Sequence, residues 1–239
     1  MSVFVLVHGA YHGAWCYNKV VPILQDAGRH TVIAVDLPGH GENRVPRDRI
    51  TLDAYVGHVC DVVDAQMEPV ILIGHSMGGL TISQVAEERP DKLKAIVFLT
   101  ALMPKDGESR VDLSTRVDEE SRVAAARIST EDGLANTVSE ELLKGLFYGD
   151  CSDEDIEFAK AHLVPQAFQP MNQKLRLSEA NYGRVPRVFI ECLQDGALSI
   201  RMQRAMYDQV GVDKVVTMDT SHSPFFSAPE ELAGHLMSL

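Results

Sequence analysis

A serine lies in the middle of residues 74–79, with one glycine two positions before it and another two positions after it. This G-x-S-x-G pattern is typical of a strained turn that exposes a nucleophilic serine between a strand and a helix. The apolar residues 70–73 predict the buried strand, and the residues after the turn predict the helix. Free N–H groups at the start of such a helix can stabilise an oxyanion. We therefore interpret Ser76 as a nucleophile for acyl transfer.

A serine hydroxyl needs a base to take its proton, and the base needs an acid to orient it. His222 directly follows the last strand that the sequence predicts, and Asp195 directly follows the strand before that. Both residues would therefore reach the edge of the sheet at which Ser76 lies. The chain order serine, aspartate, histidine is one of the known orders of a catalytic triad.

Other residues compete for the roles of acid and base. Asp219 lies three residues before His222 and is the alternative acid, while Asp195 precedes a glycine and could belong to an ordinary turn. His75 is adjacent to the serine, but we expect its side chain to point away from it. The other histidines that compete with His222 are His8, His12, His30, His40, His58, His162 and His235. We favour Asp195 and His222 because each follows a predicted strand.

The first predicted strand ends in His8, Gly9 and Ala10. A tetrahedral intermediate needs two N–H donors, one from the residue after the nucleophile and one from the loop after this strand. We expect the backbone amides of Met77 and Ala10 to supply them. His8 is then expected to brace the loop and to take no part in proton transfer.

Composition and charge limit the classes of protein to consider. The chain has 239 residues, 45% of them hydrophobic and 23% charged, which fits one domain with a sizeable core. Its formal net charge of −12 argues against nucleic acid or an anionic membrane as a partner. The four cysteines are scattered, and the N-terminal residues form neither a basic segment nor a long apolar one. We therefore expect reduced thiols, no signal peptide and a cytoplasmic location.

The elements that must position these residues alternate along the chain. Six short runs rich in β-branched residues predict strands at 3–7, 31–35, 70–73, 95–100, 187–193 and 214–218. The helices predicted between and after them are 16–27, 52–65, 80–88, 200–210 and 229–239. This alternation predicts an α/β fold with a six-stranded, mostly parallel, doubly wound sheet.

The regular spacing is interrupted between residues 100 and 187, where no strand is evident. The segment contains candidate helices at 121–128, 137–147 and 153–163. We interpret residues 104–186 as a mainly helical cap, inserted at the end of the sheet where ligands bind, and residues 1–103 and 187–239 as the core. An unrelated second lobe would look the same in sequence.

Three motifs together carry a resemblance to a known family. They are LVHGAYHGAW at residues 6–15, DLPGHG at 36–41 and GHSMGG at 74–79. The sequence resembles the branch of the α/β-hydrolases that contains the plant methylesterases and hydroxynitrile lyases, with bacterial carboxylesterase relatives, and the resemblance covers nearly the whole chain. It implies a six-stranded core with a mainly helical cap. It also implies catalytic Ser76, Asp195 and His222, oxyanion amides at Ala10 and Met77, and no metal or organic cofactor.

Two positions separate the esterases from the lyases of this branch. The lyases carry a threonine where this chain has Gly9, and a lysine after the catalytic histidine where this chain has Ser223. A lyase needs that cation to stabilise departing cyanide, whereas an esterase needs the open oxyanion hole for which Gly9 leaves space. Both positions favour ester hydrolysis through an acyl-enzyme at Ser76.

The expected substrate is a small to medium hydrophobic carboxylic ester, with aromatic and pyrethroid-type esters among those that the resemblance suggests. Aromatic and aliphatic residues of the cap and Phe225 beside the base indicate an apolar pocket. Its candidate residues are Gly9, Leu102, Phe147, Phe168, Ser223 and Phe225. The alternatives are a hydroxynitrile lyase, a lactone or carbon–carbon bond hydrolase, and a non-catalytic ligand-binding protein. A homodimer is left open.

Overall fold

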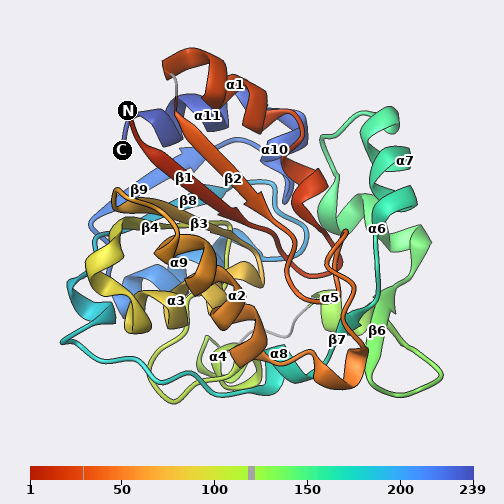
Figure 1. The fold of residues 1–239 in the computed structure, drawn as a ribbon. Coiled ribbons are helices and arrows are strands. Elements are labelled where there is room, and N and C mark those ends of the chain that lie inside the picture. The colour runs from red at the N-terminus through yellow and green to blue at the C-terminus, as the bar shows by residue number, and fades with distance from the viewer. Residues whose placement is uncertain (29, 118–121) are drawn as a thin grey trace.

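The central sheet of the computed structural model, which describes residues 1–28, 30–117 and 122–239, has six strands (Figure 1). They are β1 (Val3–Val7), β2 (Thr31–Val35), β3 (Val70–His75), β4 (Leu93–Leu99), β8 (Arg187–Cys192) and β9 (Lys214–Met218). Their order is β2-β1-β3-β4-β8-β9, and every neighbouring pair is parallel. The chain moves outward from β1 in both directions. The loops after β1 and β3 therefore flank a topological switch point, where open α/β sheets bind ligands.

Helices cover both faces of this sheet (Figure 1). One face packs against α1 (Val20–Gly28), α10 (Pro224–Ser227) and α11 (Pro229–Met237), and the other against α2 (Leu52–Asp64), α3 (Gly78–Glu88) and α9 (Ile200–Val210). Strand β1 alternates between the two layers, because successive side chains of a strand point to opposite faces. Phe4 and Leu6 pack with the first group of helices, and Val5 and Val7 with the second.

The predicted core elements are found, with changes at their ends. Short 3-10 turns join them at Ala14–Tyr17, Arg47–Arg49 and Pro90–Lys92. The helix predicted at 16–27 is in fact a 3-10 turn followed by α1. Pro22 explains the division, because proline fits the first turn of a helix but not its interior. None of the described helices combines the length and apolar character that crossing a bilayer requires.

The segment between β4 and β8 forms the cap, beyond the carboxyl ends of β1 and β2 (Figure 1). Its elements are α4 (Arg110–Arg116), α5 (Arg122–Ala125), β5 (Arg127–Ser129), β6 (Ala135–Val138), α6 (Glu140–Phe147), α7 (Asp153–His162), β7 (Gln166–Ala167) and α8 (Gln169–Asn172). The three strands form an antiparallel sheet in the order β5-β6-β7.

The expectation that this segment lacks strands is wrong. The structure places strand residues within the helices predicted at 121–128 and 137–147, and residue 121 lies outside the described residues. Strands of two to four residues are too short to show the alternation that identifies a strand in sequence. The described part of the cap is mainly helical, as expected, and contains in addition a small antiparallel sheet.

The last part of the inserted segment packs back on the core. The backbone N–H groups of Ser178 and Tyr182 donate to Glu87 of α3, at 2.7 and 3.2 Å. The N–H of Arg176 donates to Gln84 of the same helix at 3.0 Å. The 3-10 turn Tyr182–Arg184 then leads into β8. In the described structure, the cap elements over the site thus end at α8.

Candidate active site

The turn after β3 holds Ser76 in a strained conformation. Its φ is +53°, in the left-handed region that residues other than glycine seldom adopt. The carbonyl of Ser76 accepts hydrogen bonds from the N–H groups of Gly79 and Leu102, at 3.1 and 2.9 Å. A Cβ atom at Gly74 would lie 2.8 Å from the Gly78 carbonyl oxygen, so the turn requires glycine at this position. This is the strand–turn–helix geometry that exposes a nucleophile.

A buried histidine and a buried aspartate pair beside this turn. The Nδ1 atom of His222, after β9, lies 2.6 Å from Oδ2 of Asp195, after β8. The other oxygen of Asp195 accepts from the N–H groups of Ala197 and Leu198, at 2.6 and 2.8 Å. With Nδ1–H donating to the carboxylate, Nε2 of His222 is left as a proton acceptor.

Thr100, at the end of β4, completes the surroundings of the carboxylate. Its hydroxyl donates to the same Asp195 oxygen that binds His222. Thr100 is fully buried and has a φ of +36°. The sequence reasoning missed this residue. Only its place directly after β4, the neighbour of β8 in the sheet, connects it with the site, and a threonine there carries no chemical signal of its own.

The competing residues have other partners. Asp219 is exposed and accepts from the Gln194 side chain at 2.9 Å, away from His222. His75 is fully buried, and its Nε2 lies 2.8 Å from the backbone carbonyl of His222. His75 therefore positions the loop that carries His222. Among the described histidines, His222 alone pairs with a buried carboxylate.

Two buried histidines hold the loop after β1. His8 accepts from the Leu37 N–H through Nε2 at 3.1 Å and donates through Nδ1 to the Gly9 carbonyl at 2.7 Å. The peptide bond between Gly9 and Ala10 is trans. The N–H of Ala10 therefore points away from the side on which His8 holds the Gly9 carbonyl. His12 accepts from the Tyr148 hydroxyl at 2.7 Å and donates to the Ala10 carbonyl at 2.8 Å.

Burial keeps these loop histidines neutral. Loss of solvation lowers the pKa of His12 to about 4 and moves the pKa of His8 well below its usual range. Neutral imidazoles can each donate one hydrogen bond and accept another, as both residues do here. The expected bracing role of His8 agrees with these contacts, and His12 is a second brace that sequence reasoning missed.

Gly9 lies against the nucleophile. A Cβ atom at this position would be 2.8 Å from the Cβ of Ser76 and 2.9 Å from Nδ1 of His75. A side chain here would displace the turn or the histidine behind it. The space beside Ser76 thus depends on glycine at this position.

Tyr11 links the loop after β1 to the cap. It follows Ala10 and has a φ of +68°. Its hydroxyl donates to the side chain of Asn136 in β6 at 2.5 Å, and its carbonyl accepts from the N–H of Val164 at 3.0 Å. The residue next to one expected oxyanion donor is therefore bonded to the cap twice.

One cavity joins these groups. Its core wall is formed by Ala10, Tyr11, His12, His75, Ser76, Met77, Leu102, Leu198, Met202 and His222. Its cap wall is formed by Arg110, Ser114, Val123, Arg127, Phe147 and Met171. The structure thus brings the predicted nucleophile, base and both oxyanion residues to one cavity, with Asp195 behind the base.

The predicted pocket residues are only partly placed on this wall. Leu102 and Phe147 line the cavity, whereas Gly9, Phe168, Ser223 and Phe225 do not. Phe168 precedes α8, and its N–H bonds to Leu134. Pro224 starts the short helix α10, which turns Phe225 into the core, where its ring lies 5.0 Å from that of His75.

Sequence reasoning missed the polar residues of the cap wall. Arg110, Ser114 and Arg127 line a cavity that the sequence predicts to be apolar. No local motif marks them. In residues 1–28, 30–117 and 122–239, no group of three or more histidine, cysteine, aspartate or glutamate side chains is placed to hold a metal ion.

The parallel sheet, the exposed serine turn and the inserted cap define the α/β-hydrolases. Residues 4–235 match the model of the alpha/beta hydrolase family, and the chain belongs to that family. Within it, the chain is similar to methylesterase 1 of Arabidopsis thaliana, with 34% identity over 99% of this chain and 95% of the relative. It is also 34% identical to "Putative methylesterase 11, chloroplastic" of the same plant, over 99% of this chain, and spans 63% of the length of that relative.

Solved structures show the same similarity. A crystal structure of polyneuridine aldehyde esterase superposes with a TM-score of 0.89 and 29% identity, covering 100% of this chain and 98% of the other. A pyrethroid hydrolase from Sphingobium faniae JZ-2 superposes with a TM-score of 0.87 and 28% identity, covering 99% and 96%. Because these relatives are methylesterases and esterases, they support the assignment of the chain as a carboxylic ester hydrolase.

Proposed function

We infer that the chain is a serine carboxylesterase that forms an acyl-enzyme at Ser76. The observation that carries this proposal is the buried pair of Asp195 and His222, in reach of the cavity that Ser76 lines. Ser76 Oγ attacks the ester carbonyl carbon while Nε2 of His222 takes the hydroxyl proton. The N–H groups of Ala10 and Met77 stabilise the oxyanion. His222 then protonates the leaving alcohol.

The second half of the reaction releases the acid. His222 takes a proton from water, and the resulting hydroxide attacks the acyl carbon. The second tetrahedral intermediate collapses, breaks the bond to Ser76 Oγ and returns the proton to the serine. Asp195 stabilises the imidazolium ion in both halves. The carboxylate is itself held by Thr100 and two backbone N–H groups.

The substrate class rests on the apolar part of the cavity and on the names of the relatives. Leu102, Phe147 and Met171 would contact a hydrophobic acyl or alcohol group of small to medium size. The similar proteins include methylesterases and a pyrethroid hydrolase, so methyl esters and pyrethroid-type esters are the candidates to try. Gly9 and the buried Ser223 favour hydrolysis over cyanohydrin cleavage, because the lyases carry threonine and lysine there.

The test is hydrolysis of p-nitrophenyl esters from acetate to decanoate, with methyl and benzyl esters alongside. We expect turnover by the wild type, and a fall in kcat of about 10⁴-fold or more in Ser76→Ala, because the nucleophile is lost. Mandelonitrile serves as the probe for lyase activity, and we expect no cyanide release. Absence of turnover on every ester by the wild type contradicts the proposal.

A further inference from the structure

Two arginines without carboxylate partners lie in the cap wall of the cavity. Arg110 begins α4 and Arg127 begins β5, and both line the same cavity as Ser76 and His222. The Nε atoms of both arginines and the hydroxyl of Ser114 are shielded from solvent, and none of them has a hydrogen-bond partner among the described residues. Among the described residues, neither arginine forms an ion pair with a carboxylate.

Among the described residues, the side chains that Arg127 contacts are neutral. Arg127 lies 3.4 Å from the sulfur of Met171, which is only a weak acceptor, and also contacts the Tyr11 hydroxyl. Burial, followed by the positive charge of Arg127, lowers the pKa of Arg110. Proteins rarely bury charges that are not paired, because removing them from water is unfavourable. Two half-buried guanidinium groups that lack a carboxylate partner among the described residues, in the cavity that Ser76 lines, are therefore suited to a ligand that pairs with them.

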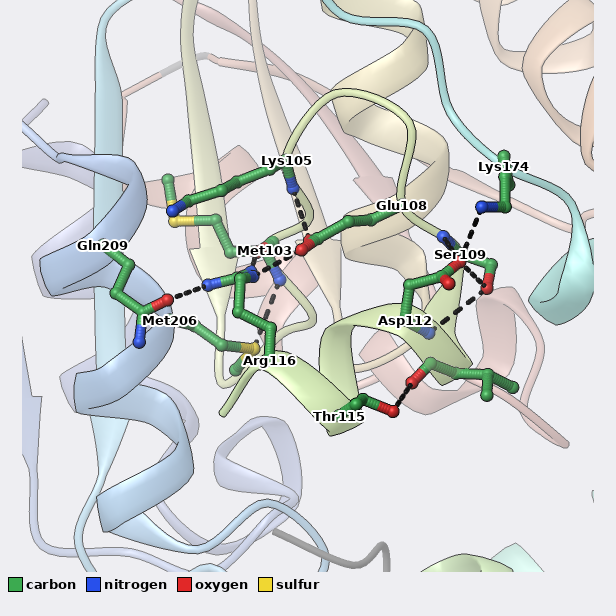
Figure 2. Close-up of polar contacts among 11 residues, drawn as sticks. Met103, Lys105, Glu108, Ser109, Asp112, Thr115, Arg116, Lys174, Met206 and Gln209 are labelled. Carbon is green, nitrogen blue, oxygen red and sulfur yellow. Dashed lines mark hydrogen bonds and ion pairs between the residues drawn. The ribbon is translucent and has the colours of Figure 1, made fainter. Parts of the chain in front are cut away.

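A third arginine on the same helix shows the contrast. Arg116 donates to Glu108 at 2.6 Å, to Gln209 at 2.8 Å and to the Met103 carbonyl at 3.0 Å (Figure 2). Every one of these partners belongs to the protein. Arg116 therefore serves the structure, whereas Arg110, six residues before it, has no such partner in the described chain.

The contacts of Figure 2 also explain how α4 is held. Ser109 and Asp112 form a capping box at the start of the helix, and Lys174 lies 3.6 Å from Asp112 (Figure 2). Arg110 and Ser114 are four residues apart and share one side of the helix. Helix α4 is thus fixed by residues on its other sides, and presents these two polar groups to the cavity.

We propose that Arg110, Arg127 and Ser114 bind a carboxylate on the substrate, so that the preferred substrate is an ester that also carries a free acid. Half-esters of dicarboxylic acids have this chemistry. This inference rests on the proposed esterase function. A guanidinium matches a carboxylate with two parallel N–H donors, and the Ser114 hydroxyl supplies a further one. The apolar part of the cavity wall, between these residues and Ser76, would contact the carbon chain that separates the acid from the ester.

The experiment compares monomethyl esters of adipic and suberic acid with the corresponding dimethyl esters. The measured quantity is the ratio of kcat/KM for the charged ester to that for the uncharged ester. We expect the wild type to favour the charged ester by about tenfold or more, and Arg110→Gln or Arg127→Gln to lower the ratio by about 10- to 100-fold, mainly through KM. Arg110→Lys keeps the charge without the paired donors and is expected to restore part of the ratio.

Arg184→Gln is the matched control, because Arg184 is an exposed arginine that pairs with Asp91 away from the cavity. It is expected to keep the wild-type ratio. Thermal unfolding gives a second readout, because a merely structural arginine would stabilise the protein. Removing an unpaired buried charge is expected to leave Tm unchanged or to raise it. A marked fall in Tm, or the same ratio in the wild type and the Arg110 and Arg127 variants, overturns the proposal.

Failure of the proposed function gives a different result. In that case the wild type hydrolyses neither kind of ester. Calorimetry of Ser76→Ala with monomethyl adipate then tests the carboxylate site without turnover. Saturable binding that is lost in the double variant Ser76→Ala, Arg110→Gln supports the site, and absence of binding to Ser76→Ala overturns it.

Discussion

The core wall and the cap wall of the cavity differ in how their polar groups are hydrogen-bonded. On the core side, the carboxylate of Asp195 accepts four hydrogen bonds, from His222, Thr100 and two backbone N–H groups. On the cap side, Arg110 and Arg127 each have a buried Nε without a hydrogen-bond partner among the described residues. Groups that are bonded within the protein are in place before a substrate arrives, which is the basis of electrostatic preorganisation. Groups that lack partners are ready to select the substrate.

The largest effect that distinguishes the two walls is expected when Asp195, the proposed acid, is substituted. Asp195→Asn should lower kcat by about 10³- to 10⁴-fold, because an amide in place of the carboxylate no longer favours the Nδ1–H tautomer or stabilises the imidazolium. The ratio for charged over uncharged esters should stay at the wild-type value, since the cap wall is unchanged.

Asp219→Asn is the control, because Asp219 is exposed and bonds to Gln194. Steady-state kinetics with both types of ester check the expectation. If the loss of kcat occurs in Asp219→Asn while Asp195→Asn stays active, the assignment of the acid is wrong.

The next effect is the dependence of folding stability on pH, which arises from histidines that are buried in the core. Besides His222, the described core holds four buried histidines, His8, His12, His40 and His75, and burial lowers the pKa of each of these four. For His12 and His40 the pKa falls from 6.5 to about 4. The unfolded chain therefore binds more protons than the folded protein between these values, and stability falls as the pH is lowered from about 6.5 to about 4.

Each of these two histidines contributes up to about 3 kcal/mol to this loss. Urea unfolding at pH 7.5 and pH 5 measures it. His40→Gln should make stability less dependent on pH, because one buried imidazole is removed, whereas a substitution of the exposed His162 should preserve the dependence. Equal stability at both pH values would contradict the expectation.

The smallest effect is expected from the residue that supports the acid. Thr100→Val keeps the shape of the side chain and removes the hydroxyl that donates to Asp195. We expect kcat to fall by about tenfold, since one charge-assisted hydrogen bond is lost. Thr31→Val, at the exposed start of β2, is the matched control. An unchanged kcat in Thr100→Val would limit the supporting role to the backbone N–H donors.

The core could be predicted from the sequence because parallel strands are buried on both faces. All six residues of β3 are buried, and the first four, residues 70–73, form a continuous apolar run. Asp195 and His222 follow such strands directly, and their meeting point follows from the parallel sheet. Thr100 has an equivalent place, but a threonine at the end of a strand carries no chemical signal of its own.

The cap could not be predicted to the same degree. Its strands have two to four residues, and the lining of the cavity depends on how α4, β5 and α6 pack against one another. Phe225 was expected in the pocket because it is aromatic and close to His222 in sequence. The short helix after Ser223 places it in the core instead. Arg110 and Arg127 are 17 residues apart in the chain, and only the tertiary structure brings them to one cavity.

Tyr11 sets a limit on how far the two walls can be redesigned separately. Its backbone adjoins the Ala10 amide, while its hydroxyl and carbonyl are bonded to Asn136 and Val164 of the cap. An engineer who enlarges the cavity by rebuilding β6 would also disturb the loop that carries the proposed oxyanion donor Ala10. We then expect the turnover of every ester to change along with the preference among esters. Neither of these two hydrogen bonds involves a residue of α4. Directed evolution for new substrates therefore has a safer starting point at Arg110 and Ser114 than at Asn136.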